Sequence, residues 1–143
     1  MSRSGYVDDY DDQGALNLYR GTVARSIRGK RGQKLLREMA AALDAMPVKE
    51  LVANDLVRED GAVCALGAVA VARKLDVAQV DESEPDDVAA AFGIARALAC
   101  EIAYENDECG DSFREGKRHE ETPAERWTRM RAWVAANVRA DTE

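Results

Sequence analysis

A thiol, an amide and a carboxylate are the side chains of this sequence best suited to act together: Cys64, Asn106 and Asp107. Cys64 is expected near the first turn of a helix, where exposed backbone N–H groups and the helix dipole can lower the pKa of a thiol. A thiol enzyme or a small-ligand site could be built on these groups. However, a cysteine among Ala and Val usually packs as a small hydrophobic residue, and Asn and Asp often end helices. Because the sequence shows no basic partner for the thiol, we assign no catalytic residue.

A run of basic side chains without an intervening acid is the second candidate site. It comprises Arg20, Arg25, Arg28, Lys30, Arg31, Lys34 and Arg37. A basic helix-turn-helix can neutralise the phosphates of nucleic acid, although a solvated basic face is the more frequent outcome. The turn RGKRGQK is not a Walker phosphate loop, because Ala24 and Arg31 stand where Gly and Ser or Thr are required.

Carboxylates are concentrated near the expected end of a helix. Glu101, Glu105 and Glu108 would share one helix face if the helix continued that far, and carboxylates suit a hard cation. The Glu-x-x-His pattern of di-iron bundles is missing, and the single histidine, His119, lies in a run of charges. We therefore expect neither a metal site nor a cofactor.

Composition indicates a folded chain that stays in the cytoplasm. Hydrophobic residues make up 46% and charged residues 33% of the 143 positions, which is ordinary for a globular protein. No apolar run reaches the ~20 residues that a membrane helix needs, and the N-terminus lacks a signal-peptide core. Three cysteines without a CxxC motif indicate free thiols in a reducing compartment. The net charge of −7 is unevenly distributed, because the basic residues gather in 15–49 and the acidic ones in 80–112.

The elements that must position these side chains are helices. Apolar residues recur at helical spacing over 15–28, 31–46, 88–103 and 123–138. The segment 61–75 is apolar around its whole circumference, which predicts a buried helix. We expect an all-α fold, a single compact domain of five or six helices around this central helix. The polar residues 1–14 would form an N-terminal arm, and 15–140 the helical domain.

Three further local structures are predicted. Thr122, Pro123 and Glu125 form a capping box with Pro at the first helical position. A short helix is expected over 48–57 and a polar loop over 109–120. On the last helix Trp133 lies beside the core stripe near arginines, which is typical of a binding hot spot or of packing at the edge of the core.

Five blocks of the sequence match a known family in order along the chain: MSRSGY, IRGKRGQKLLREM with ALDAMP, VCALGAV, FGIARALACEIAYENDE and ETPAERWTRMRAWV. They resemble a family of small uncharacterised phage and prophage proteins. The resemblance implies a phage origin and a cytoplasmic setting in the host cell, and it supplies no catalytic residue. The set Cys-Ala-x-Gly-Ala, Asn-Asp and a Thr-capped helix resembles a wider group of small proteins, also without assigned activity.

Three functions remain open at this point. The first is a phage-encoded, non-enzymatic accessory protein that binds a host macromolecule, for example a counter-defence inhibitor whose acidic segment 80–112 imitates phosphate charge. The second is a nucleic-acid-binding protein that uses the basic residues 20–37. The third is a small-ligand binder or thiol enzyme centred on Cys64, Asn106 and Asp107. We expect a host or phage protein as partner, with nucleic acid as the alternative, no membrane, and a homo-oligomer left open.

Overall fold

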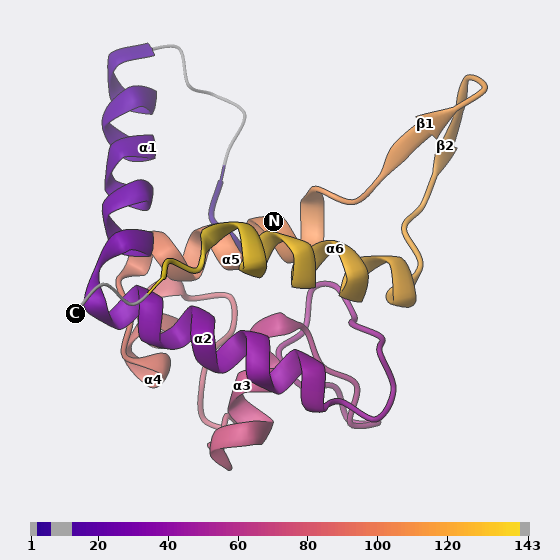
Figure 1. Cartoon of the computed structure of the whole chain (residues 1–143), viewed down its shortest axis with the longest axis horizontal. Helices are drawn as coiled ribbons and strands as arrows, with labels where there is room; N and C mark the ends of the chain where they lie inside the picture. The colour runs from indigo at the N-terminus through magenta and orange to yellow at the C-terminus, as the bar shows by residue number, and fades with distance from the viewer. Residues whose placement is uncertain (1–2, 7–12, 141–143) are drawn as a thin grey trace.

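The computed structural model describes residues 3–6 and 13–140, and gives only the backbone of residues 13–18 and 114. Within that part of the chain six helices and one two-stranded hairpin are present, so the prediction of an all-α fold is confirmed (Figure 1). The elements are α1 Gln13–Arg28, α2 Lys30–Ala45, α3 Ala65–Arg73, α4 Pro85–Phe92, α5 Arg96–Glu108, β1 Ser112–Arg114, β2 Lys117–His119 and α6 Pro123–Asn137.

The helix α2 contributes one apolar face to the hydrophobic core. Its apolar residues recur at helical spacing, and Leu35, Leu36, Met39 and Leu43 are all at most 1% exposed. This face packs against α3 and α6, while α5 lies alongside α3 and α6 and also supports α1. Figure 1 shows α1 rising from one end of α2, away from the rest of the fold.

The segment 61–75 is central but shorter as a helix than expected. Residues 63–70 are buried, as the apolar composition predicts. The helix α3, however, begins only at Ala65, and its last turn leaves the core, so that Val71 is 61% exposed. The prediction of burial on all sides is therefore wrong for the last turn, because no other element covers that side of α3.

The expected helix over 88–103 is two helices. Gly93 adopts φ 71°, a left-handed conformation that ends α4, and α5 begins at Arg96. Glycine adopts this conformation without steric cost, which makes it a common helix terminator. Pro85 stands in the first turn of α4, as predicted.

The expected helix over 48–57 is absent, because its backbone bonds go to other segments. Leu51 N–H donates to the carbonyl of Pro123, at 3.0 Å. Val52 N–H donates to the carbonyl of Val63, at 2.9 Å. The segment is thus pinned to α6 and to the residues before α3, which bury Leu51 and Leu56 without a helix.

The expected loop over 109–120 contains an antiparallel hairpin. Arg114 pairs with Lys117 across a two-residue turn, and the turn residues Glu115 and Gly116 have φ 53° and 76°. Two positive φ values match the type I′ turn that the right-handed strand twist prefers. Type I′ turns favour Asn-Gly or Asp-Gly, and of the pair Glu115-Gly116 only the glycine fits this pattern.

Specific contacts of side chains hold the start of α6 and the N-terminal segment. The capping box of α6 is confirmed, since the Thr122 hydroxyl accepts from Glu125 N–H and the Glu125 carboxylate accepts from Thr122 N–H. Of the predicted N-terminal arm, residues 7–12 lie outside the described residues. Arg3 and Ser4 are buried against the C-terminal end of α5 and do not extend into solvent. No helix of the described chain is long and apolar enough to span a bilayer.

We predict that Gly67→Ala destabilises the fold through the close approach of α3 to the 56–64 segment. A Cβ at this position would lie 1.9 Å from the Leu56 carbonyl oxygen, so the backbone must shift. The expected loss is about 2 kcal/mol or more of unfolding free energy, measured by urea denaturation.

Gly21→Ala is the matched control. Its Cβ would meet only the end of the Arg25 side chain, at 3.4 Å, inside α1. Because alanine is the better helix former, this variant should gain about 0.5–1 kcal/mol. Equal effects of the two substitutions would contradict the packing argument.

Candidate functional site

Asn106 and Asp107 lie at the last turns of α5, and Cys64 lies directly before α3, so the fold brings the three predicted residues together. The Asn106 carboxamide joins the two elements. Its Oδ1 accepts from Ala65 N–H, at 3.1 Å, and its Nδ2 donates to the carbonyl of Val52, at 3.0 Å. The Cys64 Sγ accepts from Gly67 N–H, at 3.4 Å, so the thiol acts as the cap of α3.

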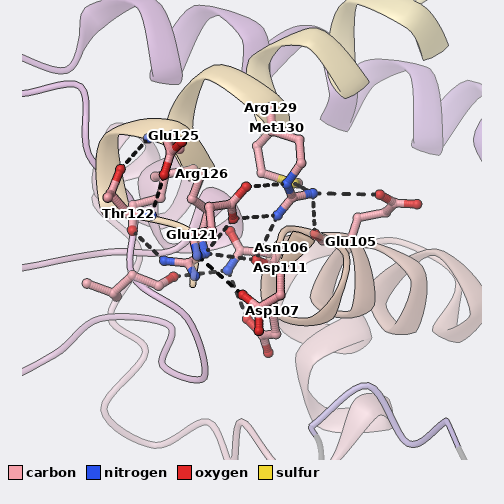
Figure 2. A network of polar contacts seen from close by, with 12 residues as sticks. Glu105, Asn106, Asp107, Asp111, Glu121, Thr122, Glu125, Arg126, Arg129 and Met130 are labelled. Carbon is pink, nitrogen blue, oxygen red and sulfur yellow. Dashed lines mark hydrogen bonds and ion pairs between the residues drawn. The ribbon is translucent and has the colours of Figure 1, made fainter. Parts of the chain in front are cut away.

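Two arginines of α6, Arg126 and Arg129, contact the end of α5 at Asn106 (Figure 2). The Asn106 carbonyl accepts from Arg126 Nε and Arg129 Nη2, at 3.1 and 3.2 Å. Arg126 also donates to the carbonyl of Leu51, at 3.2 Å, and Arg129 to that of Glu105, at 2.6 Å. Glu121, which is 8% exposed, lies between the two guanidinium groups as their common counter-ion. We call Asn106, Asp107, Glu121, Arg126 and Arg129 the Asn106 cluster.

Arg3 completes this arrangement from the N-terminal segment. Its guanidinium forms a bidentate pair with the Asp107 carboxylate, at 2.6 and 2.9 Å, and the two side chains are 7% and 2% exposed. Burial alone would raise the pKa of Asp107, but the hydrogen bond and charge of Arg3 outweigh it and hold that pKa below its usual value. Asp107 also accepts from Asn54 N–H, at 3.0 Å.

This geometry is structural in character. Cys64 is 1% exposed and Asn106 is 0% exposed. The polar groups of Asn106 and Asp107 are occupied by protein partners. No group of three or more metal-binding side chains occurs within the described residues. The convergence that the sequence suggests is therefore real, but its contacts hold α3, α5 and α6 together.

Sequence reasoning missed Arg3, Glu121, Arg126 and Arg129. Arg3, Arg126 and Arg129 have partners 20 or more residues away in the chain, whereas Glu121 pairs with the two arginines of the helix that follows it. One signal was available for Arg126. It stands four residues before Met130 and eight before Val134, in the row of α6 that faces the core. A basic residue in register with a buried stripe indicates a buried counter-charge or carbonyl.

We predict that Arg3→Ala costs about 3 kcal/mol of unfolding free energy near neutral pH, because it leaves Asp107 buried without its partner. Asp107 has a lowered pKa in the folded state. The stability that Arg3 confers is therefore fully present above the unfolded pKa of ~4 and is lost as pH falls through the folded pKa.

Urea denaturation across a pH series checks this prediction. The difference between wild type and Arg3→Ala should be largest near neutral pH and should shrink below about pH 4. Arg58→Ala is the control, since it removes the solvent-exposed Arg58–Asp60 pair, and such pairs contribute little. A constant difference at all pH values would exclude the Asp107 pair as its source.

Thiol labelling provides a test of the Cys64 arrangement. Cys109 is the exposed cysteine, but burial of its thiol, with a contribution from Glu105, raises its pKa to about 11. We predict slow labelling of Cys109 alone in the native protein, with a rate that rises about tenfold per pH unit as thiolate forms. Cys64 and Cys100 are buried and should react only on unfolding. Rapid native labelling of a Cys109→Ser variant would instead reveal an accessible second thiol.

The basic residues of 20–37 divide into two groups. Arg20 is half-exposed, but its charge is paired, because its guanidinium donates to both oxygens of the buried Glu101, at 2.9 and 3.1 Å. Tyr6 donates to the same carboxylate, at 2.7 Å. Arg37 donates to the carbonyl of Arg139, at 3.3 Å. The remaining five, which we call the basic ridge, are Arg25, Arg28, Lys30, Arg31 and Lys34.

The basic ridge surrounds the corner where α1 meets α2. Arg25, Lys30 and Arg31 line a surface cavity of about 510 Å³ at this corner. Arg28 faces a different cavity of about 310 Å³, between α1 and the C-terminal end of α6, which Arg139 also lines. The five side chains are exposed, and Figure 1 shows the corner at which the two helices that carry them meet.

No ion pair joins the basic ridge to an acid in the part of the chain that the structure describes. Elsewhere most arginines are paired. Lys30 and Arg31 also stand in the first turn of α2, which contains no acid, at the helix end where the dipole disfavours cations. The arrangement therefore places positive charge where the helix dipole disfavours it.

The acidic segment 80–112 is largely occupied within the protein. Five of its carboxylates form ion pairs with arginines: Asp86, Glu101, Glu105, Asp107 and Asp111. Glu82 accepts from Leu56 N–H, at 2.7 Å, and Glu108 from the Ser4 hydroxyl, at 2.9 Å. Six of the ten acidic residues of this segment are nevertheless exposed: Asp81, Glu84, Asp86, Asp87, Glu108 and Asp111.

Trp133 lies apart from these contacts as a half-buried residue of α6 that packs against the hydrophobic core.

Searches of protein-family models, curated proteins and solved structures find no match to this chain. The contacts of the described residues are thus the basis for assigning a function.

Proposed function

We propose that this protein is a non-enzymatic nucleic-acid-binding protein whose basic ridge contacts the phosphate backbone. The observation that supports this proposal is the contrast in pairing. Nine arginines elsewhere in the described chain form ion pairs with carboxylates, whereas the five cations that cluster in the ridge form none there. Clustered, unpaired cations at a surface are the usual footprint of a site that neutralises phosphates.

The two other functions have less support from the contacts. An inhibitor that imitates phosphate needs a free acidic surface, and half of the ten carboxylates of 80–112 are already paired with arginines. A thiol enzyme needs an accessible nucleophile, but Cys64 is 1% exposed and caps α3. The resemblance to phage and prophage proteins supports a phage origin, and with it a role in which the nucleic acid is met inside an infected cell.

Salt-dependent binding to a short DNA duplex and to one of its single strands tests the proposal. We expect binding at low salt, with the logarithm of the binding constant falling linearly with the logarithm of salt concentration. Lys34→Gln should lower the magnitude of this slope by about one, and the triple substitution Arg25→Gln, Arg31→Gln and Lys34→Gln by about three.

Lys74→Gln is the matched control for Lys34→Gln. Lys74 is an exposed lysine at the C-cap of α3, outside the ridge, and its substitution should leave the slope unchanged. Equal effects of the two lysines would indicate nonspecific attraction and contradict the proposed site. No binding of either DNA at low salt would exclude the function itself.

A further inference from the structure

Two exposed apolar features lie far apart on the described molecule. The first is Phe113 on β1, whose side chain is 77% exposed. The second is a hollow of about 540 Å³ lined by the end of α2, the 47–50 and 60–63 segments and the outer face of α3. At this hollow Val48 and Val71 are 59% and 61% exposed. Among the described residues these three side chains, with Val57, are the exposed large hydrophobic groups.

The hairpin presents Phe113 as a projecting knob. Figure 1 shows β1 and β2 extending from the body of the protein beyond α6. A two-stranded hairpin without a third strand or a packing partner is only marginally stable. The hairpin and the apolar side chain of Phe113 are therefore both exposed to solvent in the single chain.

The hollow is apolar and carries the opposite charge. Eleven of its thirteen lining residues are Ala, Val, Met, Pro or Gly, and the other two are the acids Glu50 and Asp60. Within the hairpin 112–119, Arg118 is paired with Asp111, whereas Lys117 is exposed and has no ion pair among the described residues. At the hollow Asp60 is paired with Arg58, which leaves Glu50 as the exposed acid without such a partner. A volume of this size lies within the ~300–1,000 Å³ of typical ligand pockets and accommodates an aromatic ring.

The knob and the hollow do not meet within one chain, since Phe113 is exposed and no hairpin residue lines the hollow. We propose that the hairpin of one chain docks into the hollow of a second copy, with Phe113 as the anchor and Lys117 of the hairpin against Glu50 at the rim of the hollow. Each copy has one knob and one hollow. A reciprocal dimer with two-fold symmetry therefore fills both hollows and leaves no open end.

Sedimentation equilibrium of the full chain tests this dimer. The wild type is expected to dimerise. Phe113→Ser removes the anchor and Val71→Glu places a charge in the hollow, and each is expected to raise the dimer dissociation constant by about thirtyfold or more, as loss of an aromatic anchor usually does. Both side chains are exposed, so the fold of the monomer should be unchanged by circular dichroism.

Mixing the two variants provides a sharper measurement. In a reciprocal dimer, the intact hairpin of the Val71→Glu chain can enter the intact hollow of the Phe113→Ser chain. The mixture should therefore form heterodimers more readily than either variant forms homodimers. Ala41→Glu, at an exposed position of α2 that does not line the hollow, is the control and should leave dimerisation intact.

Several results would overturn this proposal. A wild type that stays monomeric at the highest concentration reached is one of them. A dimer that Val71→Glu disrupts and Phe113→Ser does not would show a different occupant of the hollow. Open-ended assembly beyond the dimer would exclude the reciprocal arrangement. Heterodimers no more stable than the variant homodimers would do the same.

Discussion

The contacts of Asn106 are the constraint on which most of this fold depends. One buried carboxamide accepts from the first turn of α3 and donates to the 47–57 segment, and its backbone carbonyl accepts from two arginines of α6. The non-helical 47–57 segment therefore has two backbone carbonyls satisfied by Asn106 and by Arg126. Because unsatisfied polar groups in a protein interior are costly, each of these elements is needed by the others. These shared hydrogen bonds hold the short α3 at the centre of the domain.

Charges are used in two different ways on either side of this junction. In the interior, Arg3, Arg126 and Arg129 satisfy carboxylates and carbonyls at helix ends. At the α1–α2 corner the cations stand without acidic partners among the described residues. The contrast follows from position. The corner lies outside the packed interior, so nothing in the fold requires the cations there, and they are available to an external anion.

Local signals explain which parts of this structure sequence reasoning can reach. The Thr122–Glu125 capping box and the apolar stripe of α2 depend on residues close together in the chain, and both were predictable. The break at Gly93 was harder, because a glycine within a helical pattern is often tolerated. The 48–57 segment could not be predicted, since its backbone bonds to Pro123 and Val63 depend on the assembled fold. The residues Cys64, Asn106 and Asp107 lie near one another, but the capping role of the thiol becomes visible only in its hydrogen bond from Gly67 N–H.

The arrangement of α2 connects the surfaces considered above. Its first turn carries Lys30 and Arg31 of the basic ridge, and its last turn lines the apolar hollow. At 1.5 Å per residue the 16 residues of α2 place these ends about 22–24 Å apart. Two partners can therefore occupy the two ends without contact between them. If a second copy fills the hollow, each dimer carries two basic ridges, and a long polyanion that spans both would bind more tightly than one ridge allows. Both surfaces belong to the same helix, and α2 packs against α3 and α6, which the contacts of Asn106 join to α5.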